Sequence, residues 1–291
     1  MRTMSKGMTR GLLAVAIAAV GLAFTPGTAR ADDFVDFTVH EAIPALAPSV
    51  NPDFTADKLN GLYTEQLTFF FNPGSTTTGT FTAQAFANFS AYGLNGGAVN
   101  NSDIGGNANT ASTYRVNSTF SASGTFTING TQQTFVATSG MADVYLDPLN
   151  NTAGLAGSPW LANPTTRLDD VLILHADTML TPGSGGQFDT STVPNTGNFN
   201  FVLLHNTLTA VGQAYWPTLA NMIFSSTVNG DFDSVVPGNP EVISGDVSAQ
   251  FQVIPEPASL TLLGLGLASA AGMARRRKAA AQGTDSTDVQ S

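Results

Sequence analysis

Acidic side chains in turn-rich segments are the residues of this chain best able to do chemistry. Asp231 and Asp233 lie two residues apart in N-G-D-F-D-S, so on a strand their side chains share one face. Calcium takes several oxygen ligands, and Asp-rich turns supply them. Asp and Asn also make turns, however, as after Asp147 in D-P-L-N-N-T and at Asp169-Asp170, so the sequence predicts no cofactor. The alternative is a Ca²⁺ site, for which Asp231 and Asp233 are the candidate metal ligands.

The histidines form no recognisable catalytic motif. His40-Glu41 begins like the zinc-binding H-E-x-x-H, but Pro44 stands where the second histidine belongs. His175 and His205 end two apolar runs, so they either meet across a sheet or are polar strand ends. Glycosidase chemistry needs two carboxylates facing a cleft, and the sequence singles out no such pair. We therefore expect no catalytic residues and a protein that is not an enzyme.

The charge balance excludes nucleic acid as a partner. Between residues 32 and 257 the basic residues are Lys58, Arg115 and Arg167, against nineteen acidic ones, and the whole chain carries a net charge of −10. Binding to a nucleic-acid backbone requires cations that displace its counterions. The chain also has no Cys, which excludes disulfides and thiolate sites. So acidic a chain suits solubility, divalent cations or basic partners.

Alternation of apolar and polar residues predicts strands. It is clearest over 62–71 and 80–92, and the apolar run 171–174 predicts a central strand buried on both faces. Asn129-Gly130 predicts a type I′ hairpin turn. Further strands are expected at 34–39, 113–120, 142–147, 171–176 (which contains this run), 199–206, 222–228 and 247–253, and long loops at 93–110 and 181–198. This spacing predicts an all-β fold for residues 32–253, an antiparallel β-sandwich of the jelly-roll or Ig-like kind.

The first 31 residues predict a signal peptide with a short apolar helix. Three basic residues among the first ten precede an apolar stretch over 12–24, and Ala29 and Ala31 form an A-x-A cleavage site. The alternative is a retained membrane helix, but this stretch is too short to span a bilayer comfortably. The mature chain is therefore expected to begin at Asp32, and the protein to be exported.

Residues 254–278 hold three parts in a fixed order. Pro255, Glu256 and Pro257 are followed by an apolar run over 258–274 and then by Arg275, Arg276, Arg277 and Lys278. At 1.5 Å per residue the run spans roughly 26 Å as a helix, slightly short of a bilayer core of ~30 Å. It predicts a transmembrane helix whose basic end stays in the cytoplasm. A plain anchor is the alternative, but it has no need of Pro-Glu-Pro. The remaining residues, 279–291, predict a disordered tail.

This three-part order resembles the PEP-CTERM sorting signal of Gram-negative bacteria. In that family the membrane protease exosortase, which is transpeptidase-like, recognises and cleaves near the Pro-Glu-Pro. The resemblance implies exosortase as a partner, transient anchoring in the inner membrane, and a final place at the cell surface or in the extracellular matrix. The 13 residues after Lys278 are a departure, because such signals usually end soon after the basic residues.

Phrases between residues 34 and 253 resemble the flocculation-associated type of PEP-CTERM protein, among them F-T-V-H-E-A-I-P, D-D-V-L-I-L and L-T-A-V-G-Q-A-Y-W-P. The resemblance implies a non-enzymatic role in exopolysaccharide-associated floc or biofilm formation, with the extracellular polysaccharide matrix as partner. One alternative is a carbohydrate-binding or Ca²⁺-dependent adhesive module, because Trp160 and Trp216 are able to stack on sugars unless they belong to the core. A polysaccharide-modifying enzyme is the second alternative.

Overall fold

A computed structural model describes residues 35–46, 51–105, 114–181, 184–189, 191, 195–219, 222–232 and 240–253. These residues are mostly antiparallel β-structure with one short helix, α1 (Ala210–Tyr215). Among them, no helix is long and apolar enough to cross a membrane. The predicted signal helix with Ala29 and Ala31, the sorting helix with its flanking residues 255–257 and 275–277, and the tail all lie outside the described residues.

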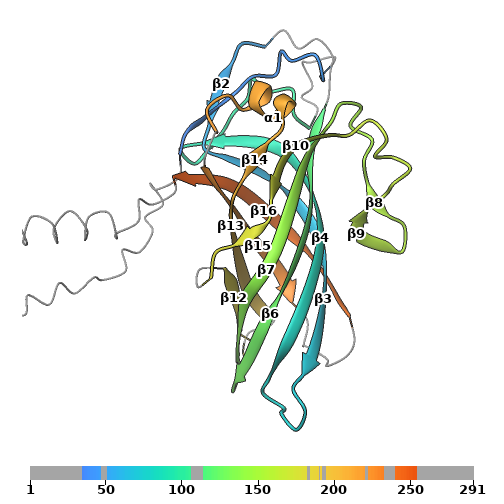
Figure 1. Cartoon of the computed structure of the whole chain (residues 1–291), viewed down its shortest axis with the longest axis vertical. Coiled ribbons are helices and arrows are strands. Elements are labelled where there is room, and N and C mark those ends of the chain that lie inside the picture. Colours follow the sequence, from blue (N-terminus) through green and yellow to red (C-terminus); the bar gives the residue numbers. More distant parts are fainter. Residues whose placement is uncertain are drawn as a thin grey trace, which may run out of the picture. The chain divides into compact units, whose positions relative to one another are not determined.

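The described strands form one large sheet and two small two-stranded sheets (Figure 1). Their bounds are β1 Phe37–Val39, β2 Phe54–Ala56, β3 Lys58–Phe71, β4 Thr78–Leu94, β5 Gly97–Ala98, β6 Arg115–Asn129, β7 Gln132–Asp147, β8 Gly154–Leu155, β9 Ser158–Ala162, β10 Val171–Ala176, β11 Thr178–Met179, β12 Gly185–Asp189, β13 Asn195–Leu204, β14 Thr207–Leu208, β15 Met222–Phe232 and β16 Glu241–Val253. Every strand expected from the sequence is present, usually longer than predicted.

Eight strands of the large sheet close into a ring. Neighbours pair in the order β13, β15, β16, β3, β4, β6 and β7, and β12 then pairs with β7 on one side and with β13 on the other. All these pairs are antiparallel. The all-β, antiparallel character of the prediction is confirmed. The predicted sandwich is not, because the strands form one closed sheet rather than two stacked ones.

The strand that closes the ring has a sequence that predicts a loop. β12 reads G-G-Q-F-D and lies within the segment 181–198. A Cβ on Gly185 would lie 2.1 Å from the carbonyl oxygen of Phe135, and one on Gly186 would lie 2.3 Å from that of Asn198. The glycines therefore allow close approach of neighbouring backbones, which is a second role of Gly within strands.

Two local predictions need correction. The hairpin between β6 and β7 has Gly130 and Thr131 as its two loop residues, because Asn129 already pairs with Gln132. Of the loop residues only Gly130 has a positive φ, 62°, which fits a type II′ turn rather than type I′. The apolar strand β10 has the predicted bounds but is not central, since it pairs with β7 and β14 beside the closed ring.

Aromatic rings fill the interior of the closed sheet. Phe135 on β7 lies 5.4 Å from Phe199 on β13 and 5.5 Å from Phe69 on β3, measured between ring centroids. Phe120 on β6 lies 4.4 Å from Phe201 on β13. These contacts cross the ring, so every second residue of its strands supplies the core while the alternate residues, rich in Thr, Ser and Gln, face outward.

One end of the ring is covered by β1, β2 and α1 (Figure 1). Under this cover the Tyr215 hydroxyl bonds those of Tyr92 and Tyr114 at 2.6 and 2.5 Å, and the Tyr114 hydroxyl donates to Glu41 at 2.7 Å. The backbone N–H of Val35 donates to the carbonyl of Phe251 at 3.0 Å. The described domain therefore begins and ends side by side at this covered end.

Candidate functional site

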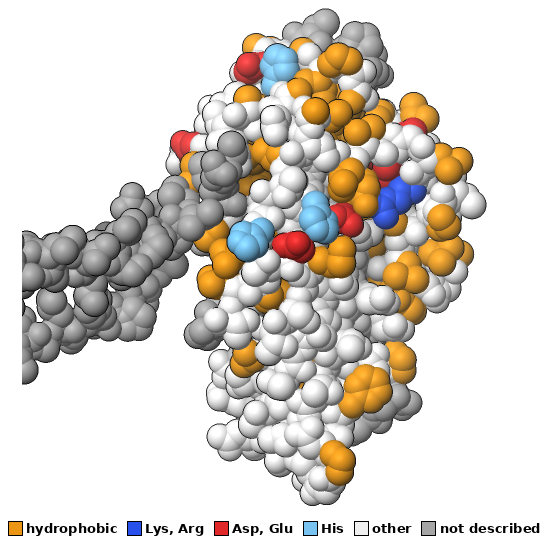
Figure 2. Space-filling view, in the orientation of Figure 1, with side chains coloured by type: hydrophobic (Ala, Val, Ile, Leu, Met, Phe, Trp, Pro, Cys, Tyr) orange, Lys and Arg blue, Asp and Glu red, His pale blue; other side chains and the backbone are white. Residues whose placement is uncertain are grey.

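A groove runs over the outer face of β3, β4, β6 and β7. It has a volume of about 670 Å³. Its lining combines small apolar groups and Met141 with many uncharged hydroxyl and amide side chains, among them Gln66, Thr68, Thr82, Gln84, Ser121 and Ser139. Figure 2 shows one outer face with few charged side chains in its lower half, and with acidic, histidine and apolar side chains in its upper half. Such a groove offers many neutral hydrogen-bond donors and acceptors at once.

The floor of the groove follows from strand alternation and one β-bulge. The β6 and β7 residues at this floor include Ser121, Ser123 and Ser139 beside the exposed Met141, and Ser123 Oγ lies 2.7 Å from Ser139 Oγ. Between Ser123 and Gly124 the register of β6 against β7 shifts. A Cβ on Gly124 would lie 2.0 Å from the carbonyl oxygen of Val136, so the bulge requires glycine there. A bulge of this kind bends the sheet locally.

Trp160 stands at one side of this surface. It lines a second hollow of about 200 Å³, which shares Gln84, Ser121 and Met141 with the groove. Trp160 is partly exposed and lies on the β8–β9 hairpin, which leaves the ring after β7 and packs against β3 and β4. Trp216, in contrast, is buried against Phe37 and Phe251 and belongs to the core. Of the two tryptophans, only Trp160 is placed to stack on a ligand in the groove.

A chain of acidic, histidine and threonine side chains borders the upper end of the groove. His175 Nδ1 donates to Asp143 Oδ1 at 2.6 Å, and its Nε2 lies 3.9 Å from Asp177 Oδ2. The Thr178 hydroxyl donates to Asp177 at 3.0 Å, so it accepts from His205 Nδ1, also at 3.0 Å. His175 and His205 are thus joined only through Asp177 and Thr178. Because the proton of Thr178 goes to a carboxylate, His205 does not act as its base.

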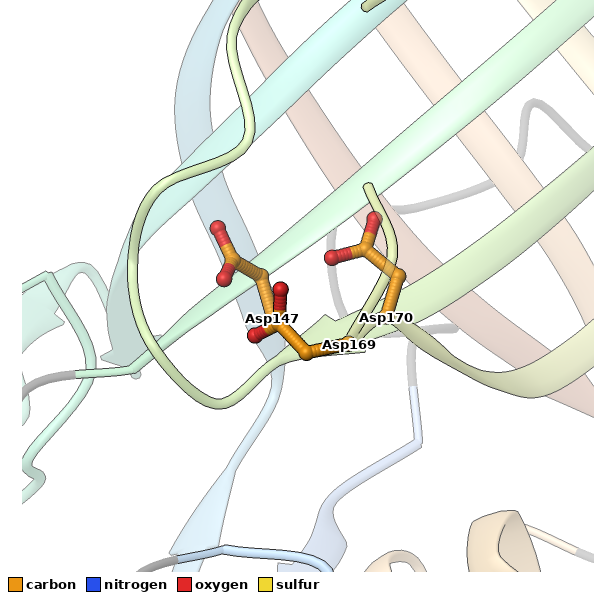
Figure 3. A group of neighbouring side chains, drawn as sticks. All are labelled: Asp147, Asp169 and Asp170. Atoms are coloured by element: carbon orange, nitrogen blue, oxygen red, sulfur yellow. The ribbon is translucent and has the colours of Figure 1, made fainter. Parts of the chain in front are cut away.

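Three carboxylates converge where β7 ends and the segment leading into β10 returns (Figure 3). One oxygen from each of Asp147, Asp169 and Asp170 lies within 4.8 Å of the others. The two oxygens of Asp147 accept backbone N–H groups of Asn151 and Thr152, at 3.2 and 2.8 Å. Asp147 therefore does make a turn, as its D-P-L-N-N-T context predicts.

Asp169 and Asp170 connect the segment that enters β10 to the turn after β7 through hydrogen bonds. Asp169 Oδ2 accepts from the backbone N–H of Leu149 at 3.3 Å, and Asp170 Oδ1 accepts from the Thr152 hydroxyl at 2.8 Å. Burial raises the pKa of Asp170, and the nearby carboxylate of Asp147 adds to this effect. The grouping of all three carboxylates was not predicted, because they come from segments 22 residues apart in the chain.

A further carboxyl group is enclosed inside the ring. Glu65 is 1% exposed, and its two oxygens have no hydrogen-bond donor among the described residues. Burial raises its pKa from 4.5 to about 8. Burial and the nearby Glu65 also raise the pKa of Tyr63, whose hydroxyl is likewise without a partner among the described residues. Glu65 is therefore mostly protonated at neutral pH.

The predicted metal pair is not tested by the structure. Asp231 lies in the last part of β15, where only the backbone is described, and Asp233 lies outside the described residues. The groove was also missed by sequence reasoning, although its signal was present: the alternate residues of β3 and β4 that oppose the apolar face are Thr and Gln.

β16 ends at Val253, and the chain continues directly into the proline-flanked segment. Residues 253–278 match the PEP-CTERM protein-sorting motif. The PEP-CTERM motif implies processing by exosortase and export through the membrane to the cell surface. It covers only the end of the chain, so it does not assign an activity to the domain before it. Comparisons with curated proteins and with solved structures found no match.

Proposed function

We propose that the exported domain is a non-enzymatic component of an extracellular polysaccharide matrix and promotes floc or biofilm formation by holding polysaccharide in its outer groove. The observation that carries this proposal is the hydroxyl- and amide-rich lining of the groove, beside the hollow that Trp160 lines. Sugar rings present hydroxyl groups at their edges and apolar C–H groups on their faces. Polar side chains pair with the first, and the amphipathic ring of Trp packs against the second.

Charge indicates the class of polymer. Nineteen acidic residues between 32 and 257 face only three basic ones, and Asp143 and Asp177 border the groove. An acidic polysaccharide would be repelled by these charges, whereas a neutral or amino-sugar polymer would not. The partner is therefore a neutral or cationic polysaccharide of the Gram-negative cell that exports the protein.

Deletion of the gene tests the proposal. Flocs are expected to be smaller or absent while the amount of secreted polysaccharide stays the same, and complementation with the wild-type gene restores them. Complementation with a Trp160→Ala variant restores export but not floc formation. Flocs that persist unchanged in the deletion strain would contradict the proposal.

A carbohydrate-binding or Ca²⁺-dependent adhesive module is the second candidate, favoured by the exposed part of Trp160 and by the cluster of Asp147, Asp169 and Asp170. A glycan array probed with and without chelator separates this from a bulk matrix role, since an adhesive module shows saturable binding to defined sugars.

Incubation of the purified chain with native polymer tests the third possibility, a polysaccharide-modifying enzyme. We expect no change in polymer length.

A further inference from the structure

The carboxylates of Asp147, Asp169 and Asp170 have the spacing of ligands around one cation. Calcium–oxygen distances are about 2.3–2.6 Å, so two oxygens on opposite sides of the ion are separated by at most about 5 Å. The three ligand atoms lie within 4.8 Å of one another. The hydrogen bonds that each carboxylate accepts use only part of its lone pairs, since an ionised carboxylate has about four acceptor sites.

An independent observation at the same place is an amide oxygen without a partner. Asn117 lies on β6 beneath the cluster and is 0% exposed. Its Nδ2 donates to Asp170 Oδ2 at 2.9 Å, so its amide group contacts the cluster directly. Its Oδ1, however, is buried and accepts no hydrogen bond from any described residue. Leaving such an atom buried without a partner is destabilising, and amide oxygens are common Ca²⁺ ligands.

The charges near the cluster do not balance. Arg167 Nε lies 3.4 Å from Asp170 Oδ2, and this is the only ion pair that the cluster makes among the described residues. The guanidinium of Arg167 also covers the ring of Tyr145, at 3.6 Å from its centroid. Arg115 is opposite Asp147 in the β6–β7 ladder but forms no ion pair with it. Three carboxylates thus face one paired guanidinium, and a divalent cation would compensate the excess negative charge.

We infer that Asp147, Asp169, Asp170 and the amide oxygen of Asn117 form a Ca²⁺ site. The ligands come from the end of β7, the entry to β10 and the outer face of β6. The ion therefore joins both ends of the 148–170 segment to the closed sheet. Because this segment carries Trp160, Ca²⁺ also fixes one side of the hollow that adjoins the groove. The metal site itself rests on the cluster and does not depend on what the groove binds.

Calcium binding is measured on the full chain, purified in detergent, by calorimetry with CaCl₂ and by thermal unfolding in 10 mM CaCl₂ or in EDTA. The wild type is expected to bind one Ca²⁺ with a dissociation constant of about 0.1–1 mM, the range of extracellular modules. Saturation should raise Tm by about 3–10 °C. Limited proteolysis within 148–170 should be slower with CaCl₂ than with EDTA.

Asp169→Asn is the decisive variant, because Asp169 is only partly buried and the Asn oxygen retains the turn contact to Leu149. It should weaken Ca²⁺ binding at least tenfold and reduce the rise in Tm in 10 mM CaCl₂ to about half or less. In EDTA its Tm should equal or exceed that of the wild type, since one of three like charges is gone. Asp36→Asn, which removes an exposed carboxylate elsewhere, is the matched control and should bind Ca²⁺ like the wild type.

Three results would overturn the inference: a wild-type Tm that is the same in CaCl₂ and EDTA, Ca²⁺ binding that survives Asp169→Asn, or equal loss of binding in Asp36→Asn. Co-sedimentation of the purified chain with polysaccharide, measured in CaCl₂ and in EDTA, separates this inference from the proposed function. If the chain binds Ca²⁺ and still sediments with polysaccharide in EDTA, both the Ca²⁺ site and the polysaccharide contact are supported. Absence of sedimentation in either buffer removes the polysaccharide contact and leaves the metal site intact.

Discussion

Replacing Glu65 by Gln is expected to stabilise the protein, and to do so more strongly as pH rises. Glu65 is enclosed by the closed sheet without a hydrogen-bond donor among the described residues, and burial raises its pKa from 4.5 to about 8. Between these two pH values the folded state holds a proton that the unfolded state has released. Stability therefore falls as pH rises through this window. Gln has nearly the same shape and never ionises.

The magnitude follows from the two pKa values. One pKa unit corresponds to about 1.36 kcal/mol, so Glu65 destabilises the fold by about 3 kcal/mol at pH 7 and by about 5 kcal/mol well above pH 8. Below pH 4.5 both states are protonated, and the contribution vanishes. The stability difference between Glu65→Gln and the wild type should therefore grow from near zero at pH 4 to several kcal/mol at pH 8.5.

Urea unfolding of the full chain in detergent at pH 4, 7 and 8.5 measures this difference. Asp36→Asn, which removes an exposed carboxylate, is the control and should change the free energy of unfolding by less than about 0.5 kcal/mol at each pH. If the difference in free energy of unfolding between Glu65→Gln and the wild type is the same at all three pH values, Glu65 does not titrate with a raised pKa. A Glu65→Gln variant that is less stable at pH 8.5 would show that the carboxylate has a favourable partner.

Four further changes have expected outcomes. Trp160→Ala should weaken the binding measured by co-sedimentation with polysaccharide roughly fivefold, since an aromatic contact contributes about 1 kcal/mol. It should leave Tm nearly unchanged. Unaltered co-sedimentation would exclude Trp160 from the contact. Gly124→Ala should lower stability by about 1–3 kcal/mol in urea unfolding, because its Cβ would meet the Val136 carbonyl oxygen at 2.0 Å; a neutral effect would mean that the bulge relaxes. Phe135→Ala should lower stability by about 3–5 kcal/mol in the same assay, as it empties a site between Phe69 and Phe199. Glu256→Ala should leave a larger, membrane-bound precursor on immunoblots, and wild-type-like processing would contradict a role of Glu256 in recognition.

Strand positions were predictable because alternation of apolar and polar residues reports directly which face of a strand is buried. In the predicted strand over 62–71, alternation puts Glu65 on the same face as Leu67 and Phe69, and all three are buried in the structure. The closure of the sheet was not predictable from this signal. β12 has only five residues and begins with Gly185 and Gly186, so it lacks alternation and resembles a loop.

The candidate sites, too, were predictable from the sequence only in part. Asp147 could be predicted as a turn residue, because Asp caps local backbone N–H groups. Its meeting with Asp169 and Asp170 depends on the path of the 148–170 segment, which no local pattern encodes. The sorting motif at 253–278 was predictable because its meaning lies in the order of three short parts rather than in a fold.

Fractionation of cells into membrane, matrix and medium, with mass spectrometry of the chain in each fraction, shows where the processed domain resides. We expect the domain to be mostly in the matrix fraction, to begin near Asp32, to end near the Pro-Glu-Pro segment, and to be released when the polysaccharide is degraded. A chain that still ends at Ser291 and stays in the membrane, or a domain found free in the medium while the matrix is intact, would contradict this expectation.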